Sequence, residues 1–289
     1  MYANFDLLVP EKLDQALGMI SKAKAANDFA PLGGGTNLVV EMRAKGVGPA
    51  TLVSVGQLAG LRGIAVADGT VTIGASTTVS DILRDPRMKQ VAPALVESAD
   101  VFAGQMIRNT ATVAGNICCG SPAADLVPPL LALGASVTLR SGSGTRTVPL
   151  DGYFTGYKTS VRKPDELLTA ISWPVPAAKS ASSFYKLGRR RGDAITMVGV
   201  SVFVSLKNGV CDTVRIALGA VGPCVMRVKK AEAVLLGKAP TAALIAQAAQ
   251  AASAESTPLD DIRASGDYRK EQVEVLVKRL LTQSLESLS

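Results

Sequence analysis

The spacing of apolar residues predicts a mixed region of helices and strands in the first part of the chain. Behind Pro10, helical spacing is shown by Leu13, Ala16, Leu17, Ile20 and Ala23, and proline fits the first turn because its missing N–H is not needed there. Asp68-Gly69 lies between alternating apolar residues and predicts a hairpin. Further strands and helices are predicted over 52–55, 63–75, 90–100, 122–133, 135–141 and 145–150.

A different pattern begins after 174–183, a segment rich in proline, alanine and serine that is the best linker candidate. Beyond it, Asn208-Gly209 separates two alternating apolar stretches and predicts another hairpin. Helices are then predicted over 229–237, 241–252 and 271–288. The last of them carries a single apolar stripe formed by Val273, Leu276, Val277, Leu280, Leu281 and Leu285. The change of pattern predicts two domains, 1–177 and 178–289.

The composition predicts a substantial core and excludes several kinds of chemistry. Of 289 residues, 47% are hydrophobic and 19% are charged. No apolar run reaches the roughly 18 residues of a membrane span, and no basic stretch followed by an apolar one opens the chain, so we expect a soluble cytoplasmic protein. The sequence has no histidine, which excludes Ser-His-Asp and Cys-His nucleophiles within this chain. Redox or group-transfer chemistry would therefore come from a cofactor.

The charge and the cysteines argue against a nucleic-acid site and a metal site. The net charge is +7, but only 4% of residues are aromatic and the basic residues are scattered, which suits an acidic partner or an anionic cofactor better than nucleic acid. The four cysteines, Cys118, Cys119, Cys211 and Cys224, form no C-x-x-C pair. We expect them to be small buried residues without zinc or an iron–sulfur cluster.

The first of two small-residue loops, 31–38, follows a predicted strand. Its three consecutive glycines allow positive φ and let backbone N–H groups converge on an anion, and Thr36 and Asn37 add side-chain hydrogen bonds. The G-x-G-x-x-G spacing is missing, and no helix is predicted behind the loop, so this is not the dinucleotide fingerprint. A turn with only a structural role is the alternative.

The second loop, 110–125, supplies hydroxyls and an amide among small residues. It is predicted to open a helix with Ser121 as N-cap and Pro122 in the first turn, with Asp125 close behind. Two such loops could close on one polyphosphate or dinucleotide, with backbone amides on the charge and the carboxylate on ribose or amide protons. Stabilisation of the helix N-terminus is the alternative role of Asp125.

Together these motifs resemble the FAD-binding medium subunit of the molybdenum hydroxylases, the group of xanthine dehydrogenase, carbon monoxide dehydrogenase and related aldehyde and N-heterocycle dehydrogenases. The resemblance spans essentially the whole chain. The family's glycine-rich loop is similar to 32–38, and its T-x-G-G-N-I segment with a following aspartate is similar to 112–117 and Asp125. The A-G-x-Q-I-R-N stretch resembles 103–109, the strand whose leucine touches the flavin resembles 165–168, and the stretch with a flavin-contacting lysine resembles 184–186.

The resemblance implies a set of FAD contacts and neither catalytic nor metal-binding residues in this chain. The implied contacts are Leu32, Gly33, Gly34, Gly35, Thr36, Asn37, Leu38, Phe102, Thr112, Ala114, Gly115, Asn116, Asp125, Leu168 and Lys186. Lys186 would stabilise negative charge on the reduced ring and raise its potential, whereas the residues alone equally allow a solvated lysine beside the arginines 189–191. Two positions depart from the family: Ala114 replaces the first glycine of G-G-N, and Asn37 stands where relatives often have an acidic or other polar residue.

The fold that the resemblance implies is α+β: a two-lobed FAD-binding domain of the PCMH-like type over 1–177, followed by a C-terminal domain of a sheet and helices over 178–289. The implied function is that of the FAD subunit of a molybdenum-dependent oxidoreductase. A large subunit would hold the molybdenum cofactor, a small subunit would hold two-iron–two-sulfur clusters, and FAD here would pass electrons to an external acceptor, in a dimer of heterotrimers. Neither nucleic acid nor a membrane span is implied.

Two other functions are compatible with the residues. One is a self-contained flavin-dependent oxidoreductase, which the absence of histidine disfavours because such an enzyme needs a group for proton transfer. The other is a non-enzymatic nucleotide-binding or scaffold protein whose glycine loops are only turns. A visible spectrum separates them, because a flavin protein is yellow.

Overall fold

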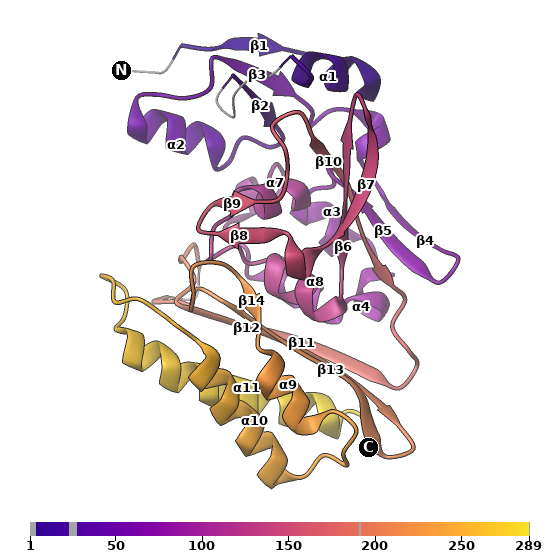
Figure 1. Cartoon of the computed structure of the whole chain (residues 1–289), viewed down its shortest axis with the longest axis vertical. Helices are drawn as coiled ribbons and strands as arrows, with labels where there is room; N and C mark the ends of the chain where they lie inside the picture. Colours follow the sequence, from indigo (N-terminus) through magenta and orange to yellow (C-terminus); the bar gives the residue numbers. More distant parts are fainter. Residues whose placement is uncertain (1–3, 23–27, 191, 289) are drawn as a thin grey trace.

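The computed structural model describes residues 4–22, 28–190 and 192–288, whose elements are stacked in three tiers along the long axis of the molecule (Figure 1). Ala23, at the end of the first predicted helix, and Arg191, in the predicted arginine cluster, lie outside these residues. The upper tier contains the first elements of the chain, the middle tier holds most of the first half, and the lower tier contains the last strands and helices.

The upper tier is a three-stranded parallel sheet in the order β1-β3-β2. Its elements are β1 (Asp6–Leu8), α1 (Leu13–Ile20), β2 (Phe29–Leu32), α2 (Leu38–Lys45), β3 (Thr51–Ser54) and the 3-10 helix η1 (Ala59–Leu61). Leu52 in the central strand pairs with Leu7 on one side and Ala30 on the other. The predicted helix behind Pro10 is confirmed, and its apolar face packs on Val53 and Val55 in a small core.

The middle tier is built on a five-stranded antiparallel sheet in the order β4-β5-β10-β6-β7. Its strands are β4 (Ile64–Ala67), β5 (Thr70–Gly74), β6 (Ser136–Ser141), β7 (Gly144–Pro149) and β10 (Leu167–Pro174). Asp68 and Gly69 have φ values of 50° and 70°, as the mirror-image turn of a tight hairpin requires, so this hairpin is confirmed.

Short helices and a small hairpin complete the middle tier and bury a core around Trp173, whose indole donates to the Val91 carbonyl. The elements are α3 (Val79–Arg84), α4 (Met88–Val91), α5 (Pro93–Asp100), α6 (Gln105–Arg108), α7 (Val113–Cys118), α8 (Val127–Leu133), the 3-10 helix η2 (Leu150–Gly152), β8 (Phe154–Gly156) and β9 (Thr159–Ser160).

The lower tier is a four-stranded antiparallel sheet with helices on its far face (Figure 1). Its elements are β11 (Ser180–Leu187), β12 (Val198–Lys207), β13 (Val210–Gly219), β14 (Met226–Arg227), α9 (Lys229–Leu235), α10 (Ala242–Glu255) and α11 (Gly266–Glu286). The Asn208-Gly209 hairpin and the three helices are confirmed, and all six residues of the predicted stripe in α11 are buried.

The lower sheet is covered on both faces, because its near face lies against α5 and α8 of the middle tier. Hydrogen bonds fix this contact: the Phe184 amide donates to Glu97 Oε2 at 2.6 Å, and the Ala220 amide donates to the Pro122 carbonyl at 2.7 Å. The middle and lower tiers are therefore joined by polar contacts as well as by apolar packing.

The structure corrects two local predictions. The linker is shorter than 174–183, because β10 extends to Pro174 and β11 begins at Ser180, where pairing with β12 makes the small residues extended. The helix predicted over 122–133 begins only at Val127. Ser121 is not its N-cap, since the Ser121 hydroxyl accepts from the Ala123 amide in a local turn and leaves the start of α8 to Pro128 and Pro129.

None of the helices within the described ranges is long and apolar enough to cross a bilayer. The division of the chain at 177/178 stays a prediction.

Leu281 tests the core of the lower tier. It is fully buried in the stripe of α11, so Leu281→Ala should lower the free energy of unfolding by about 2–5 kcal/mol through lost burial and a cavity. Leu259→Ala is the matched control: Leu259 is 82% exposed, and its change should stay within about 0.5 kcal/mol. Urea unfolding measures both, and equal effects would contradict the packing of α11 described above.

Candidate functional site

The glycine loop lies where β2 passes into α2 at the edge of the parallel sheet. Gly35 has a φ of 71°, which favours glycine, and Asn37 is the N-cap residue of α2. A helix therefore does follow this loop, contrary to the sequence prediction. The prediction was wrong because the apolar residues of Leu38–Lys45 show no helical period. The sheet edge, the turn and the helix start together form a strand–loop–helix unit.

The backbone of this loop carries donors that the protein itself does not use. Within the described ranges, the N–H groups of Gly34, Gly35, Thr36 and Asn37 donate no hydrogen bond to another part of the chain. Gly34, Gly35 and Thr36 are half-buried and Asn37 is exposed, and unpartnered amides at the start of a helix favour an anion. The loop can therefore bind a phosphate group through its main chain.

The second loop meets the first. A Cβ atom placed on Gly34 would lie 1.8 Å from the Thr110 carbonyl oxygen, and one on Gly33 would lie 2.9 Å from Thr112 Oγ1. Only glycine permits this approach, since 1.8 Å is shorter than any non-bonded contact. The predicted convergence of two loops far apart in the sequence is thus present in the structure.

Thr112 starts the short helix α7 within the second loop, and its hydroxyl accepts from the Gly115 amide at 3.0 Å. The next amides of α7 are also used: Val113 donates to the Thr77 carbonyl at 3.0 Å and Ala114 to the Ala75 carbonyl at 3.4 Å. This helix start is therefore a rigid wall of the site, and the amides available to an anion come from the glycine loop.

Asn116 and Ala114 support the fold of the second loop. Asn116 Oδ1 accepts from the Leu126 amide at 3.1 Å, which ties α7 to the start of α8. Ala114 is 8% exposed and belongs to the core of the middle tier, which explains why a methyl group is accommodated where the family has glycine. Their contacts with FAD stay a prediction.

Asp125 and Lys186 form an ion pair between the middle and lower tiers. Lys186 Nζ on β11 lies 2.6 Å from Asp125 Oδ2, and the two side chains are only 9% and 10% exposed. The hydroxyl of Thr196, just before β12, donates to the other oxygen, Asp125 Oδ1. Burial raises the pKa of Asp125, while Lys186 and Thr196 act in the opposite direction. Lys186 is thus paired and mostly buried, rather than solvated.

Phe102 lies near this pair, on the turn between α5 and α6. The Arg108 guanidinium holds the turn by donating to the carbonyls of Asp100, Phe102 and Ala103, and Ala103 adopts a φ of 37°. Lys186 Nζ also lies 3.5 Å from the carbonyl of Val101 in the same turn. The Lys186 ammonium therefore lies beside the turn that carries the half-buried Phe102.

The other predicted residues occupy different surroundings. Leu32 ends β2, and Thr36 and Leu38 are half-buried beside the glycines, so all three lie at the first loop. Leu168 is 2% exposed in the core of the middle tier, which leaves it little surface for a ligand. Asn37 donates from Nδ2 to Glu41 Oε1 at 3.1 Å on its own helix.

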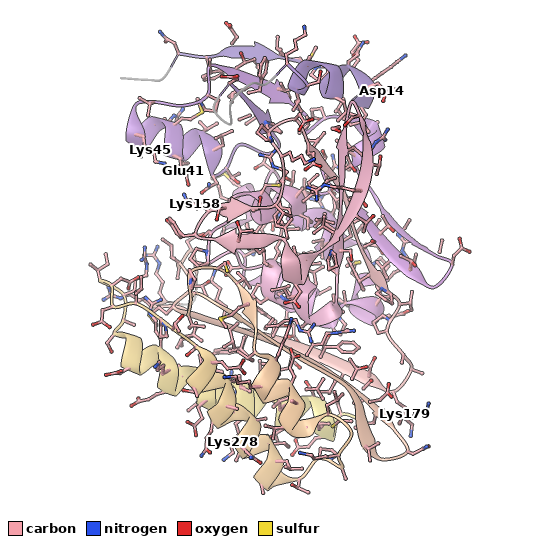
Figure 2. All side chains as sticks on the ribbon, in the orientation of Figure 1. Asp14, Glu41, Lys45, Lys158, Lys179 and Lys278 are labelled. Atoms are coloured by element: carbon pink, nitrogen blue, oxygen red, sulfur yellow. The ribbon has the colours of Figure 1, made fainter. Side chains whose placement is uncertain are left out.

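A surface ion pair ties the first loop to the rest of the site. Glu41 of α2 pairs with Lys158 of the β8–β9 turn, and Figure 2 shows these two side chains at the junction of the upper and middle tiers. The Lys158 amide donates to the Gly120 carbonyl at 3.2 Å, so this turn also contacts the second loop. Lys158 pairing lowers the pKa of Glu41.

The sequence reasoning missed Thr196 and Lys158. Both lie outside the motifs, and each acquires its role from a partner far away in the chain, so no local signal marks them. The sequence motifs indicate Asp125 and Lys186 one by one, and only the structure shows that they form an ion pair.

The described residues contain no group of three or more histidine, cysteine, aspartate and glutamate side chains that could hold a metal. Cys211 is buried, Cys119 and Cys224 are half-buried, and Cys118 is exposed, with its sulfur 3.7 Å from the Tyr153 hydroxyl. The expected burial is therefore wrong for Cys118. The expectation that the cysteines bind no metal stays a prediction.

The three main sheets with their helices give an α+β fold, in which the two touching loops and the buried pair form a candidate binding site for a nucleotide cofactor. Residues 3–176 match the family described as "FAD binding domain in molybdopterin dehydrogenase", and residues 183–284 match "CO dehydrogenase flavoprotein C-terminal domain". The chain belongs to this family of FAD-binding subunits of molybdenum-dependent oxidoreductases, and its cofactor is FAD.

Individual relatives agree over nearly full length. The carbon monoxide dehydrogenase medium chain of Hydrogenophaga pseudoflava is 31% identical over 96% of both chains, and the nicotinate dehydrogenase FAD-subunit of Eubacterium barkeri is 31% identical over 99% of this chain and 97% of its own. A solved carbon monoxide dehydrogenase from H. pseudoflava, which lacks the Mo-pyranopterin moiety, matches with a TM-score of 0.94 and 32% identity over 99% of both chains. Quinoline 2-oxidoreductase from Pseudomonas putida 86 matches with a TM-score of 0.90 and 25% identity, over 100% of this chain and 99% of its own.

The residues fit FAD at both ends of the site. Four amides of the glycine loop donate to no acceptor among the residues that the structure describes and suit a diphosphate, whereas the turn of Phe102 and the ammonium of Lys186 suit an aromatic ring that gains negative charge on reduction.

Gly34→Ala tests the contact of the two loops. The new Cβ would meet the Thr110 carbonyl, so the loops must separate, and FAD content after purification should fall at least tenfold. Gly18→Ala is the matched control, since nothing lies within 4 Å of its added Cβ. Full FAD content in a folded Gly34→Ala protein would show that the contact is not needed for the cofactor.

Lys186→Met tests the buried pair. It leaves Asp125 buried without a counter-charge, so the apoprotein should lose about 3–5 kcal/mol of unfolding free energy at pH 7. The folded pKa of Asp125 is raised from 3.8, so its protonated form favours the fold. The difference in unfolding free energy between Lys186→Met and the unmodified protein should therefore be small below pH 3.8. It should grow as pH rises above the pKa that Asp125 has in the folded, unmodified protein.

The double variant Asp125→Asn/Lys186→Met removes both charges and should recover part of the loss at pH 7. Urea unfolding of the four proteins of this cycle measures the coupling, and additive effects would contradict a buried ion pair.

Proposed function

We propose that this chain is the electron-transferring subunit of a multi-subunit molybdenum hydroxylase, in which FAD receives electrons from iron–sulfur clusters of a small subunit and delivers them to an external acceptor. The observation that supports the proposal is the contact of the two loops at Gly34 and Thr110 in a chain of this family, together with four amides of the first loop that donate to no acceptor within the described part of the chain. When bound, FAD supplies an acceptor for one or two electrons.

Different residues of this chain would bind different parts of FAD. The amides of 34–37 would hold the diphosphate, with Gly33 and Leu32 keeping the strand end close to Thr112. Lys186, paired with Asp125, would place a positive charge by the ring, and Phe102 would pack against it. Leu38, Ala114, Gly115, Asn116 and Leu168 would shape the walls between these ends.

The partners are a large subunit with the molybdenum cofactor and a small subunit with two-iron–two-sulfur clusters, in a dimer of heterotrimers in the cytoplasm. The names of the relatives, a medium chain and a FAD-subunit, support a division of the activity among several chains. The net charge of +7 suits acidic partner surfaces. We propose the boundary between the FAD-binding domain, 1–177, and the C-terminal domain, 178–289, on the same basis.

The alternative is a self-contained flavin-dependent oxidoreductase. It would need its own group for proton transfer to or from the substrate, and the carboxylate and ammonium at the ring end, Asp125 and Lys186, are committed to each other. The chain without partners should therefore have a flavin and no route from an organic substrate to it.

Expression of the chain alone tests the proposal. The purified protein should bind FAD but reduce no artificial dye with purines, aldehydes or N-heterocycles, and dye reduction should appear when the other two subunits are added. As a control, chemical reduction of the bound FAD must be followed by dye reduction. Substrate-dependent dye reduction by the chain alone would favour the self-contained enzyme, and a colourless chain that takes up no FAD would contradict both.

A further inference from the structure

Thr196 is a buried residue that belongs to none of the motifs and yet touches the ion pair of the site. It is 4% exposed, and its hydroxyl donates to Asp125 Oδ1, while Lys186 takes Asp125 Oδ2. The carboxylate is thus shared between two donors from the lower tier, one charged and one neutral. Ser98 holds the main chain of the same residue, donating to the Asp125 carbonyl at 2.7 Å.

The backbone fixes Thr196 relative to Lys186. Lys186 is near the end of β11, and Thr196 lies two residues before the start of β12. The Met197 amide donates to the Leu187 carbonyl at 2.8 Å, which closes the ladder between the two strands. The loop that joins the two strands is pinched where a Cβ on Gly188 would lie 2.9 Å from the Ala194 Cβ. The hydroxyl and the ammonium therefore approach Asp125 from two adjacent strand ends.

The Thr196 hydroxyl affects how many N–H donors of Lys186 are needed by Asp125. An ammonium has three N–H donors. Lys186 uses one on Asp125 Oδ2 at 2.6 Å and has a long contact of 3.5 Å to the Val101 carbonyl, and no third acceptor occurs among the residues with described positions. A carboxylate oxygen that lost the Thr196 hydroxyl would be buried without a donor, and the spare donors of Lys186 are the nearest replacement.

We propose that Thr196 is a positioning residue: by satisfying one oxygen of Asp125, it leaves the Lys186 ammonium with an N–H available for the flavin. The inference rests on the proposed function, because it assigns Lys186 to the ring end of FAD. Without the hydroxyl, the carboxylate turns so that both of its oxygens take Lys186 donors, and the positive charge near the ring is more fully neutralised. The ring then gains less stabilisation on reduction.

The test compares Thr196→Val, which keeps the shape and removes the hydroxyl, with Thr196→Ser, which keeps the hydroxyl, in the FAD-loaded chain. Redox titration of the bound flavin should show that Thr196→Val lowers the preference for reduced over oxidised FAD about tenfold, which is about 30 mV for a two-electron couple. Thr196→Ser should titrate as the unmodified chain does. Lys186→Met should shift the potential in the same direction and by at least as much.

Ser201→Ala is the matched control, because it removes another fully buried hydroxyl of β12, one that donates to the Ser183 carbonyl at 3.1 Å. It should cost stability without moving the potential. If Thr196→Val does not fold, Thr196→Cys, with a weak S–H donor, replaces it and should shift the potential the same way.

The outcomes separate the inference from the function on which it rests. An unchanged potential in FAD-loaded Thr196→Val, or an equal shift in Thr196→Ser, overturns the positioning role and leaves the chain a flavin subunit. An unmodified chain that binds no FAD overturns the proposed function first.

Discussion

The approach of the Gly34 backbone to the Thr110 carbonyl is the constraint on which the rest of the site depends. A side chain at this position would begin 1.8 Å from a main-chain oxygen, so the two loops can touch only where the Cβ is missing. The first loop follows β2 of the parallel sheet in the upper tier. The second loop belongs to the middle tier, where it follows α6 and contains α7. The cofactor site is therefore a property of how two tiers meet.

The ring end of the site depends in the same way on the junction of the middle and lower tiers. Asp125 is held by Lys186 and Thr196 from two adjacent strands, and Phe184 in the same strand as Lys186 bonds Glu97 on α5. Burial of a carboxylate and an ammonium costs desolvation that their attraction only partly offsets. The pair is tolerated because each oxygen of the Asp125 carboxylate accepts from a donor, Oδ2 from Lys186 and Oδ1 from Thr196.

The sequence predicted the hairpins at Asp68-Gly69 and Asn208-Gly209, the helix behind Pro10 and the stripe of α11, because each is decided by residues close together in the chain. It failed for α2, whose apolar residues lack a helical period and which is held by tertiary contacts such as Glu41 with Lys158. Motifs pointed to Gly34, Asp125 and Lys186 separately. The convergence of the loop of Gly34 with the loop that begins at Thr110 was also predicted, whereas Thr196 could not be, because its contact with Asp125 joins segments whose distance in space only the folded chain sets.

Because the ladder between β11 and β12 is closed, the sequence of the loop that joins them can change during evolution while Lys186 and Thr196 keep their positions. The loop 188–195 leaves and re-enters the sheet at a pinched neck, so the positions of Lys186 and Thr196 are set below the neck and not by the residues of the loop. Ile195 is 57% exposed on this loop. Within the described residues, the side chains of Arg189 and Arg190 donate to the carbonyl oxygens of Ile262, Gly192 and Asp193. Substitutions at such exposed positions can accumulate while the pair of Lys186 with Asp125 stays in place. The surface presented to the outside and the chemistry of the interior are thus separable during evolution, although only nine residues lie between Lys186 and Thr196.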